Sequence, residues 1–540
     1  MKVYGGKSVL NSNQLARLAA HLLLIAALAL SSALVPLVGA KADDKPEEKK
    51  LESRDKVLRN AKKAMRSGKY EDAAKLYGEL IRADGRDITA RLGASFACLK
   101  MQNYLHSFEH ALEALKIDAS NARAHALAGA NLLRSGFVRA SVSELQRALD
   151  LDPKEALAYG AAAEVDFYEG RAKESREKSY YASNLDPDEP DYLVTYARAS
   201  SRLEDFKEAA DAYEAFLQIA PLSDTERRDR IKGLIQFYRQ LAGIQIHQVS
   251  GDTVTEAPFH LGNDRRPYIQ LKLNGRDALF VVDTGSGFTV ISKDAAKRFG
   301  VSEIAKGGKS QGVGGTGKFQ IVYGLIKSIQ IGGVRIRMVP CFIRPFHGTN
   351  DHPPEERAEG FIGLSILSRF LTELDYKDTV IRLDRSENRA VPMPSLPGVT
   401  VTPFRTTQNG LISVETEFEG NQLVNAIVDS GASSTVLSQA AVDRLKLRDQ
   451  IIKGQTTSVI GAAGITDNVE MLLVRKCRVA DAQQSNLRAL VLDFGAINET
   501  SGFEQGGILG GDFLRHYRLT IDFNRAVLAL TPHTPPITKQ

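Results

Sequence analysis

Between residues 54 and 245 the apolar and polar positions follow a helical period, and the pattern recurs at a fixed interval of 34 (118 − 84). The recurrence is marked by aspartates at one phase, namely Asp84, Asp118, Asp152 and Asp186. The next position in the series, Ala220, precedes Pro221 just as the last two aspartates precede prolines. A repeat of this length is typical of helix pairs stacked into a solenoid. The pattern therefore predicts an all-α repeat domain over residues 54–245, with five copies followed by a capping helix at 225–244.

Small side chains recur with the same spacing, at positions where two helices of a pair must approach closely. Two series of small residues have this spacing. The first is Ala61, Ser95, Gly129, Ala163 and Ala197, and the second is Ala73, Ser107, Ser141, Ser175 and Ala209. Gly68, Gly136 and Gly170 stand between the helices of a pair, where a turn is needed. On these residues the segment resembles the tetratricopeptide repeat (TPR). The resemblance implies a surface that binds a peptide or protein partner, and a plain spacer is the alternative interpretation.

From about residue 255 to 530 the pattern changes to short segments of strand character broken by glycine. One phrase occurs twice there, as Val281-Val282-Asp283-Thr284-Gly285-Ser286 and as Ile427-Val428-Asp429-Ser430-Gly431-Ala432. Each copy ends an apolar run on an aspartate, which is followed by a hydroxyl residue and a glycine that permits a tight turn. The two copies predict a duplicated, mainly-β lobe, with lobe 1 over 255–385 and lobe 2 over 398–532.

Landmarks beyond the two phrases keep the same order at nearly the same distance. An apolar pair followed by glycine ends at an offset of 80 from Asp283 (363 − 283) and of 81 from Asp429 (510 − 429). A glycine-rich segment begins at an offset of 29 from the first aspartate (312 − 283) and of 32 from the second (461 − 429). A single Asp-Thr-Gly can be explained by the preference of Asp and Gly for turns. The ordered set of landmarks indicates instead that the whole lobe is duplicated.

At these landmarks the chain resembles the retropepsin-like aspartic proteases, whose active site takes one Asp-Thr/Ser-Gly from each of two lobes. The resemblance implies an acid protease fold with fused lobes, in which Asp283 and Asp429 are catalytic. It also implies residues that support the site, namely Thr284, Gly285, Ser430 and Gly431. Thr284 and Ser430 would form hydrogen bonds between the lobes. The glycine-rich segments would be flaps over the substrate, with Gly314, Gly315 and Gly461 as their glycines.

The residue types suit this chemistry, because two neighbouring carboxyls share one proton. The ionised carboxylate takes a proton from water, while the protonated carboxyl donates to the peptide carbonyl. Ser286 follows the first triplet where Ala432 follows the second, so Ser286 is a further supporting residue. Its hydroxyl predicts that Asp283 is the more readily ionised aspartate. The alternative to an enzyme is a scaffold that holds a peptide without cutting it.

The N-terminal residues predict export. Lys2, Lys7 and Arg17 precede an apolar run at 22–30, and small residues follow it up to about residue 42. This order is typical of a signal peptide, and an uncleaved membrane anchor is the alternative. Residues 43–53 form a charged linker that is too polar to pack. We therefore expect a periplasmic or extracellular protein, with membrane attachment through residues 1–42 as the alternative.

Composition narrows the functional classes. The chain of 540 residues is 43% hydrophobic and has a net charge of +5. Its basic residues are interspersed with acidic ones, so the sequence shows no signature of nucleic-acid binding. Its three cysteines and ten histidines show no metal-ligand spacing, so we expect neither metal nor cofactor. The sequence therefore predicts an exported aspartic endopeptidase, a hydrolase, preceded by TPR repeats.

Overall fold

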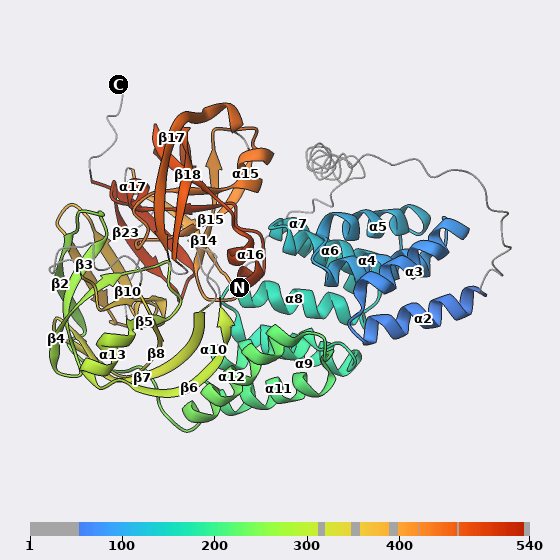
Figure 1. Ribbon diagram of the computed structural model, residues 1–540, viewed down its shortest axis with the longest axis horizontal. Helices are drawn as coiled ribbons and strands as arrows, with labels where there is room; N and C mark the ends of the chain where they lie inside the picture. Colours follow the sequence, from blue (N-terminus) through green and yellow to red (C-terminus); the bar gives the residue numbers. More distant parts are fainter. Residues whose placement is uncertain are drawn as a thin grey trace. The chain divides into compact units, whose positions relative to one another are not determined.

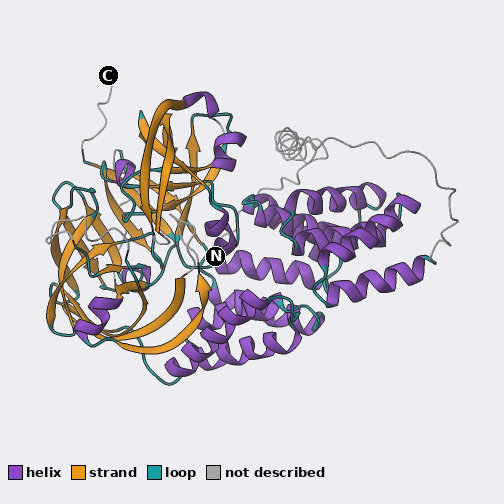
Figure 2. Cartoon of the chain, in the orientation of Figure 1, coloured by secondary structure: helices purple, strands orange, loops and turns teal. Residues whose placement is uncertain are grey.

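The computed structural model describes residues 53–310, 319–346, 357–387, 398–420, 422–461 and 464–533. Helices occupy the described chain up to Leu241, and strands predominate from Gln248 onward (Figure 2). The predicted signal or anchor (1–42), nearly all of the predicted linker, and Gly314 and Gly315 lie outside the described residues. Within the described ranges, no helix has the length and apolar character needed to cross a bilayer.

The chain forms two compact units, and the division falls within the helical region. The first unit holds the described residues up to Ala162 together with Lys178–Pro190 and Ile219–Asp224. The second unit holds Ala163–Glu177, Asp191–Gln218 and the residues from Thr225 onward. The last helices thus belong with the strands, because helix α12 (Thr225–Leu241) packs directly on strand β6 (Ser302–Ser310).

Ten helices between Arg54 and Ile219 follow one another as five pairs with the predicted period (Figure 1). They are α2 (Arg54–Arg66), α3 (Tyr70–Ala83), α4 (Ile88–Lys100), α5 (Tyr104–Ile117), α6 (Ala122–Arg134), α7 (Val138–Leu151), α8 (Ala156–Tyr168), α9 (Ala172–Leu185), α10 (Asp191–Arg202) and α11 (Phe206–Ile219). The second helices of successive pairs end at the constant interval of 34 (117 − 83), from Ala83 to Ile219. The predicted all-α repeat region is confirmed.

The periodic aspartates have a local function at the helix ends. Asp84, Asp118 and Asp152 are the C-cap residues of α3, α5 and α7. Each side chain accepts a hydrogen bond from the backbone N–H two residues further on, at 2.8 to 2.9 Å. Such a bond stabilises a turn after the helix, so the repeat marks where one helix pair passes to the next.

The small residues allow close packing within the pairs. Ser95 of α4 and Ser107 of α5 are fully buried, and each hydroxyl donates to the backbone carbonyl of the other residue at 2.7 and 2.6 Å. At Gly129 of α6 a Cβ atom would lie 2.7 Å from the Leu145 side chain of α7. Larger side chains at these positions would separate the helices.

Within the second unit the described strands form two sheets. The 14-stranded sheet has the order β12 (Thr400–Pro403), β24 (Val527–Pro532), β23 (Tyr517–Asp522), β10 (Leu371–Asp375), β11 (Val380–Asp384), β2 (Val254–Leu261), β3 (Pro267–Leu273), β4 (Arg276–Val282), β9 (Gly360–Ile362), β5 (Thr289–Ser292), β8 (Val334–Arg344), β7 (Phe319–Ile331) and β6, with β1 (Gln248–Gly251) also on β8. The 10-stranded sheet has the order β17 (Ile451–Gly461), β18 (Gly464–Val474), β21 (Leu487–Leu492), β16 (Val436–Ser438), β22 (Gly507–Leu509), β15 (Leu423–Val428), β14 (Ile412–Phe418), β19 (Cys477–Val479) and β20 (Ala482–Gln484), with β13 (Arg405–Thr406) on β14.

The two lobes repeat one pattern of strand pairing. In lobe 1, β4 pairs in parallel with β9, and β5 pairs with β9 on one side and with β8 on the other. In lobe 2, β15 pairs in parallel with β22, and β16 pairs with β22 and with β21. The duplication inferred from the sequence landmarks is therefore a duplication of topology.

Short helices complete the two lobes. They are α13 (Lys293–Phe299), α14 (Leu364–Leu367), α15 (Gln439–Arg444), the 3-10 helix η4 (Arg448–Gln450), α16 (Gly495–Ser501) and α17 (Gly511–Leu514). Ser292 and Ser438, which close the repeated Thr-Val-Ile/Leu-Ser segments, are the N-caps of α13 and α15. Each hydroxyl accepts a backbone N–H three residues on, which explains why serine recurs there.

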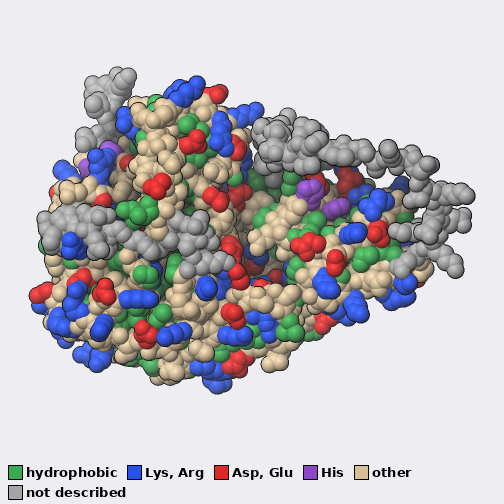
Figure 3. All heavy atoms as spheres, viewed as in Figure 1, with side chains coloured by type: hydrophobic (Ala, Val, Ile, Leu, Met, Phe, Trp, Pro, Cys, Tyr) green, Lys and Arg blue, Asp and Glu red, His purple; other side chains and the backbone are tan. Residues whose placement is uncertain are grey.

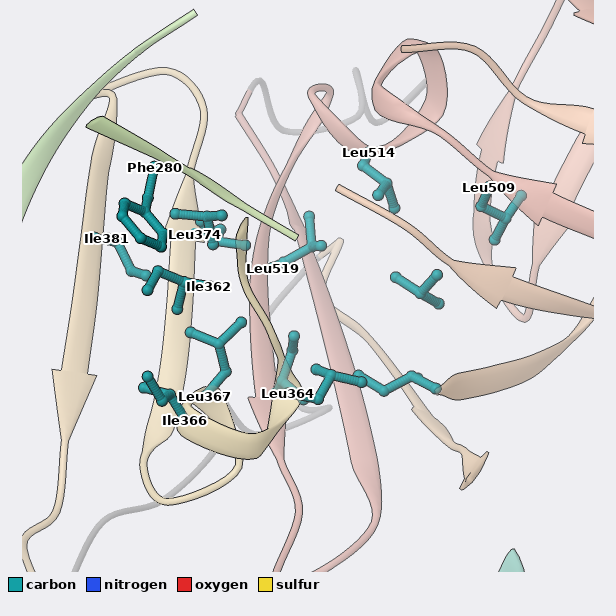
Figure 4. Close-up of a cluster of buried hydrophobic side chains, with 14 of the residues drawn as sticks. Phe280, Ile362, Leu364, Ile366, Leu367, Leu374, Ile381, Leu509, Leu514 and Leu519 are labelled. Carbon is teal, nitrogen blue, oxygen red and sulfur yellow. The ribbon is translucent and has the colours of Figure 1, made fainter. Parts of the chain in front are cut away.

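The closing strands of the two lobes join them into one structure. Strand β10 of lobe 1 pairs with β23 of lobe 2, with Leu374 opposite Leu519. Both leucines are fully buried, and Figure 4 shows them in one cluster with Phe280, Ile362 and Leu509. The apolar core is therefore continuous across the two lobes of a single chain.

Candidate active site

Two strand ends position the aspartates of the repeated phrase. Asp283 follows β4 and Asp429 follows β15, and each lies beside the partner strand of its lobe. The backbone N–H of Asp283 donates to the Ile362 carbonyl, and that of Asp429 donates to the Leu509 carbonyl, both at 3.0 Å. Ile362 and Leu509 belong to the apolar-Gly landmarks of the sequence. These landmarks therefore repeat in the two lobes because each one binds the backbone of an aspartate.

Four hydrogen bonds between the lobes hold the two phrases together. The Thr284 hydroxyl donates to the Val428 carbonyl at 2.7 Å and accepts the Ser430 backbone N–H at 2.9 Å. Reciprocally, the Ser430 hydroxyl donates to the Val282 carbonyl at 2.8 Å and accepts the Thr284 N–H at 3.0 Å. Both side chains are buried, so the loss of one partner would leave an unpaired polar group.

The two glycines of the phrases make room for the opposite aspartate. A Cβ atom on Gly285 would lie 2.2 Å from the Asp429 Cγ, and one on Gly431 would lie 2.5 Å from the Asp283 Oδ1. No real Cβ tolerates such contacts. Each glycine of the two Asp-Thr/Ser-Gly phrases is therefore required because it leaves space for the aspartate of the other lobe.

The carboxyl groups of Asp283 and Asp429 are hydrogen-bonded to each other and partly buried. Burial raises the pKa of both, and the neighbouring charge of Asp429 raises the pKa of Asp283 further, well above its ordinary value. The Asp283 Oδ1 accepts one backbone N–H, from Gly285 at 2.8 Å. The Asp429 Oδ1 accepts two, from Gly431 at 2.8 Å and from Ala432 at 3.1 Å. Asp429 is therefore the more readily ionised aspartate, since N–H donors stabilise a carboxylate.

This order reverses the expectation drawn from Ser286. Its hydroxyl donates to the Phe288 carbonyl at 2.8 Å rather than to Asp283, and its backbone N–H is directed to the Asp283 carbonyl at 3.4 Å. The Ser286 hydroxyl therefore stabilises the backbone of the turn that follows Asp283. The expectation that Ser286 makes Asp283 the more acidic member was wrong, because it considered the side chain and not the backbone donors.

Two arginines near the aspartates have no counterpart in the repeated phrases. The charge of Arg344, at the end of β8, opposes the rise in the pKa of Asp283, and the charge of Arg266 opposes that of Asp429. The Arg344 guanidinium lies over the rings of Phe319, Phe346 and Phe361 at 5.4 to 5.9 Å. Comparison of the two lobes could not reveal these arginines, since neither residue repeats.

The predicted flap glycine of lobe 2 lies at the end of a hairpin. Gly461 is the last residue of β17 and pairs with Gly464 of β18. The flanking Ile460 and Ile465 are about half exposed, at 49% and 51%. In lobe 1 the corresponding hairpin is β6–β7, whose connection with Gly314 and Gly315 lies outside the described residues. A flap function for these hairpins stays a prediction.

Other candidate chemistry is limited. Across the described ranges, no group of three or more His, Cys, Asp or Glu side chains is arranged to hold a metal ion. Cys98, Cys341 and Cys477 are all free and buried. On the face drawn in Figure 3, lysine and arginine side chains are interspersed with aspartate and glutamate. The aspartate pair is thus the candidate reactive centre that the fold organises.

Fold and site together define an aspartic protease-like pair of lobes, and the family comparison agrees. Residues 269–366 and 414–513 each match the family described as aspartyl protease. A relative by sequence is the DNA damage-inducible protein 1 of Kluyveromyces lactis, 31% identical over 133 residues. That match covers 24% of this chain and 29% of the relative, less than a third of its length. The resemblance to aspartic proteases is confirmed for the two lobes.

Solved structures of both parts are also similar to this chain. An aspartic proteinase from Irpex lacteus is 12% identical, with a TM-score of 0.35, over 53% of this chain and 99% of its own. A thermophilic TPR protein of Thermus thermophilus is 18% identical, with a TM-score of 0.30, over 34% of this chain and 99% of its own.

Proposed function

We propose that the protein is an aspartic endopeptidase that hydrolyses peptide bonds with a water activated by Asp283 and Asp429. The observation that carries the proposal is the partly buried, hydrogen-bonded carboxyl pair, held by the reciprocal interlobe bonds of Thr284 and Ser430. A carboxyl pair that shares one proton supplies a base and an acid at the same point. The match of both lobes to aspartyl proteases supports the same reaction.

The asymmetry of the pair supports one division of the two proposed roles. Asp429, as the carboxylate, takes a proton from the attacking water, whose oxygen forms a bond to the peptide carbonyl carbon. Asp283, as the acid, donates its proton to the carbonyl oxygen, so a neutral tetrahedral diol forms. Collapse of the diol breaks the C–N bond: the protonated Asp429 donates its proton to the leaving nitrogen, and Asp283 takes a proton from one diol hydroxyl, so that the carbonyl of the new carboxyl group forms. The proton count is restored, and no cofactor enters the balance.

The test is cleavage of a mixed peptide library by the purified protein from acidic to neutral pH. We expect cleavage by the wild type, and loss of at least about a thousandfold in both Asp283→Asn and Asp429→Asn. Asp481→Asn, at an exposed site on the turn between β19 and β20, is the matched control and should retain wild-type rates. Absence of cleavage at every pH, with peptide binding intact, would instead establish the peptide-holding scaffold.

The repeats and the N-terminus extend the proposal. We infer that the TPR-like helices bind the peptide or protein substrate, or a separate protein partner, and that residues 1–42 direct export or attach the protein to a membrane. The charged and apolar order of residues 2–30 supports the second inference. Expression with and without residues 1–42, followed by fractionation, tests it. Equal distribution of the two forms would refute export.

A further inference from the structure

Helix α12, which follows the last repeat, lies against the β6–β7 hairpin of lobe 1 (Figure 1). The backbones meet at two glycines, because a Cβ on Gly233 of α12 would lie 2.1 Å from the Gly307 Cα of β6. Next to it, a Cβ on Gly308 would lie 2.9 Å from the Arg230 backbone nitrogen. Strand β6 is the last strand of its sheet, so the helix covers an edge that would otherwise be open.

An aromatic contact lies beside these glycines. The ring of Phe237 on α12 stacks on Tyr323 of β7, with centroids 4.3 Å apart and planes at 18°. Both side chains are buried. Stacked aromatic pairs of this kind contribute beyond their buried area, so the contact fixes the hairpin arm against the helix.

The contact continues toward the catalytic turn through two further rings. Tyr323 lies edge-on to Phe342 of β8 at 5.5 Å, and Phe342 lies 4.6 Å from Phe288. Phe288 carries the carbonyl that accepts the Ser286 hydroxyl in the turn after Asp283. A continuous series of packed rings therefore connects α12 with the residues that follow the first aspartate.

On its other side α12 is fixed to the repeats and to lobe 2. Tyr238 stacks on Phe206 and Tyr213 of α11, with centroids 5.7 and 6.1 Å apart. Arg230 forms an ion pair with Glu499 of α16 at 3.0 Å. The helix thus contacts the hairpin of one lobe, a helix of the other, and the last repeat.

We propose that α12 is a positioning element for the active site, and that Gly233 and Phe237 are its positioning residues. They hold the described arms of the β6–β7 hairpin, and through Tyr323 and Phe342 the Phe288 turn, at the place where an extended peptide would lie beside the carboxyl pair. This inference rests on the proposed endopeptidase function. It assigns to the helical region a part in peptide binding at the catalytic site, in addition to any partner it binds elsewhere.

The sharpest variant is Gly233→Ala, because alanine strengthens the helix itself while its methyl group displaces β6. Gly78→Ala is the matched control, since a Cβ in α3 would meet only the Arg82 guanidinium at 3.6 Å. We expect kcat/KM to fall roughly tenfold or more in Gly233→Ala, mainly through KM. The pH profile should be unchanged, since the carboxyl pair keeps its own hydrogen bonds. Equal kcat/KM in Gly233→Ala and Gly78→Ala would overturn the proposal.

A second pair separates positioning from loss of folding. Phe237→Leu removes the ring that contacts Tyr323, whereas Phe108→Leu removes a similarly buried ring of α5, a helix of the first compact unit. Hydrogen exchange should become faster in β6 and β7 for Phe237→Leu and stay at the wild-type rate for Phe108→Leu. This measurement needs no catalysis, so it tests the positioning contact even if the wild type cuts no peptide. Unchanged exchange in β6 and β7 would refute the contact's role.

Discussion

At the scale of single residues, the two aspartates are unequal because their backbone neighbours are unequal. Asp429 accepts the N–H groups of Gly431 and Ala432, whereas Asp283 accepts that of Gly285. Two turns of nearly identical sequence thus give carboxyls of different acidity. The inequality assigns the acid and the base in the proposed reaction, and it has a measurable effect on stability.

That effect is a pH dependence. Burial raises the pKa of Asp283 well above 3.8, so the folded protein binds this proton more tightly than the unfolded chain does. The resulting stability is fully present below the unfolded pKa and is lost as the pH rises through the folded pKa. Asparagine does not titrate. The free energy of unfolding of Asp283→Asn should therefore rise relative to the wild type with increasing pH, by up to about 1.4 kcal/mol per pH unit.

Urea unfolding at several pH values measures this difference. The exposed Asp481→Asn serves as the control and should follow the wild type at every pH. A stability difference between Asp283→Asn and the wild type that does not change with pH would contradict the raised pKa.

The hydroxyl of Thr284 gives a second prediction. Thr284→Val keeps the shape of the side chain but leaves the Val428 carbonyl and the Ser430 N–H without their partner. Because both groups are buried between the lobes, we expect a loss of about 1–3 kcal/mol in the free energy of unfolding. Thr456→Val, at an exposed position of β17, should change it by less than about 0.5 kcal/mol. Equal effects of the two variants in urea titrations would mean that the cross-lobe bonds add nothing.

Individual contacts were predictable only where the chain repeats them. The aspartates, glycines and hydroxyls of the two phrases could be assigned from the sequence, since each copy gives evidence for the other. The Ser286 hydroxyl could not, because its partner depends on the backbone of one turn. Arg344 was missed for a related reason, since its closeness to Asp283 depends on the path of β8 and leaves no pattern in the sequence.

At the scale of elements, helix pairing depends on the size of a few side chains. Gly129→Ala would place a methyl group 2.7 Å from Leu145, so we expect it to destabilise the helical region by about 1–3 kcal/mol. Gly78→Ala has room for its methyl group and should stabilise by about 0.5–1 kcal/mol. Far-UV circular dichroism during urea unfolding measures both. Stabilisation by Gly129→Ala would show that the helices can separate without cost.

Elements were predicted well where their boundaries carry chemical signals. The aspartates at helix ends, the small packing residues and the strand-Asp-Thr-Gly phrases each mark a local structure. The contact between α12 and the β6–β7 hairpin carries no such signal. Gly233 and Gly307 are far apart in the sequence, and neither glycine belongs to a repeat. Such a contact exists only once both partners are folded.

At the scale of the whole molecule, one chain supplies both halves of the site. The pairing of β10 with β23 joins its two lobes in a single sheet, and the interlobe bonds of Thr284 and Ser430 lie within the same chain. The sequence left open whether lobes pair within or between chains. The intrachain arrangement predicts that activity is a property of the monomer.

A mixing experiment tests this arrangement. Asp283→Asn and Asp429→Asn, refolded together, should show no more cleavage than either variant alone, and specific activity of the wild type should be independent of dilution. If lobes exchanged between chains, some mixed pairs would contain two intact aspartates. Recovery of about a quarter of wild-type activity on mixing would then be expected, since random pairing restores half of the sites in half of the pairs.

The shared sheet also has a consequence in time. Thr372 of β10 pairs with Ile521 of β23, and the two positions are separated by 149 in the sequence (521 − 372). The ribosome therefore adds Ile521 that much later than Thr372. At the usual rate of translation this delay is roughly 7 to 30 seconds. During that interval lobe 1 lacks its neighbouring strand, and the carboxyl pair is incomplete until Asp429 has been added. The enzyme we propose would therefore be inert until Asp429 and strand β23 have been synthesised, and a chain truncated before residue 517 would lack the strand that joins the two lobes.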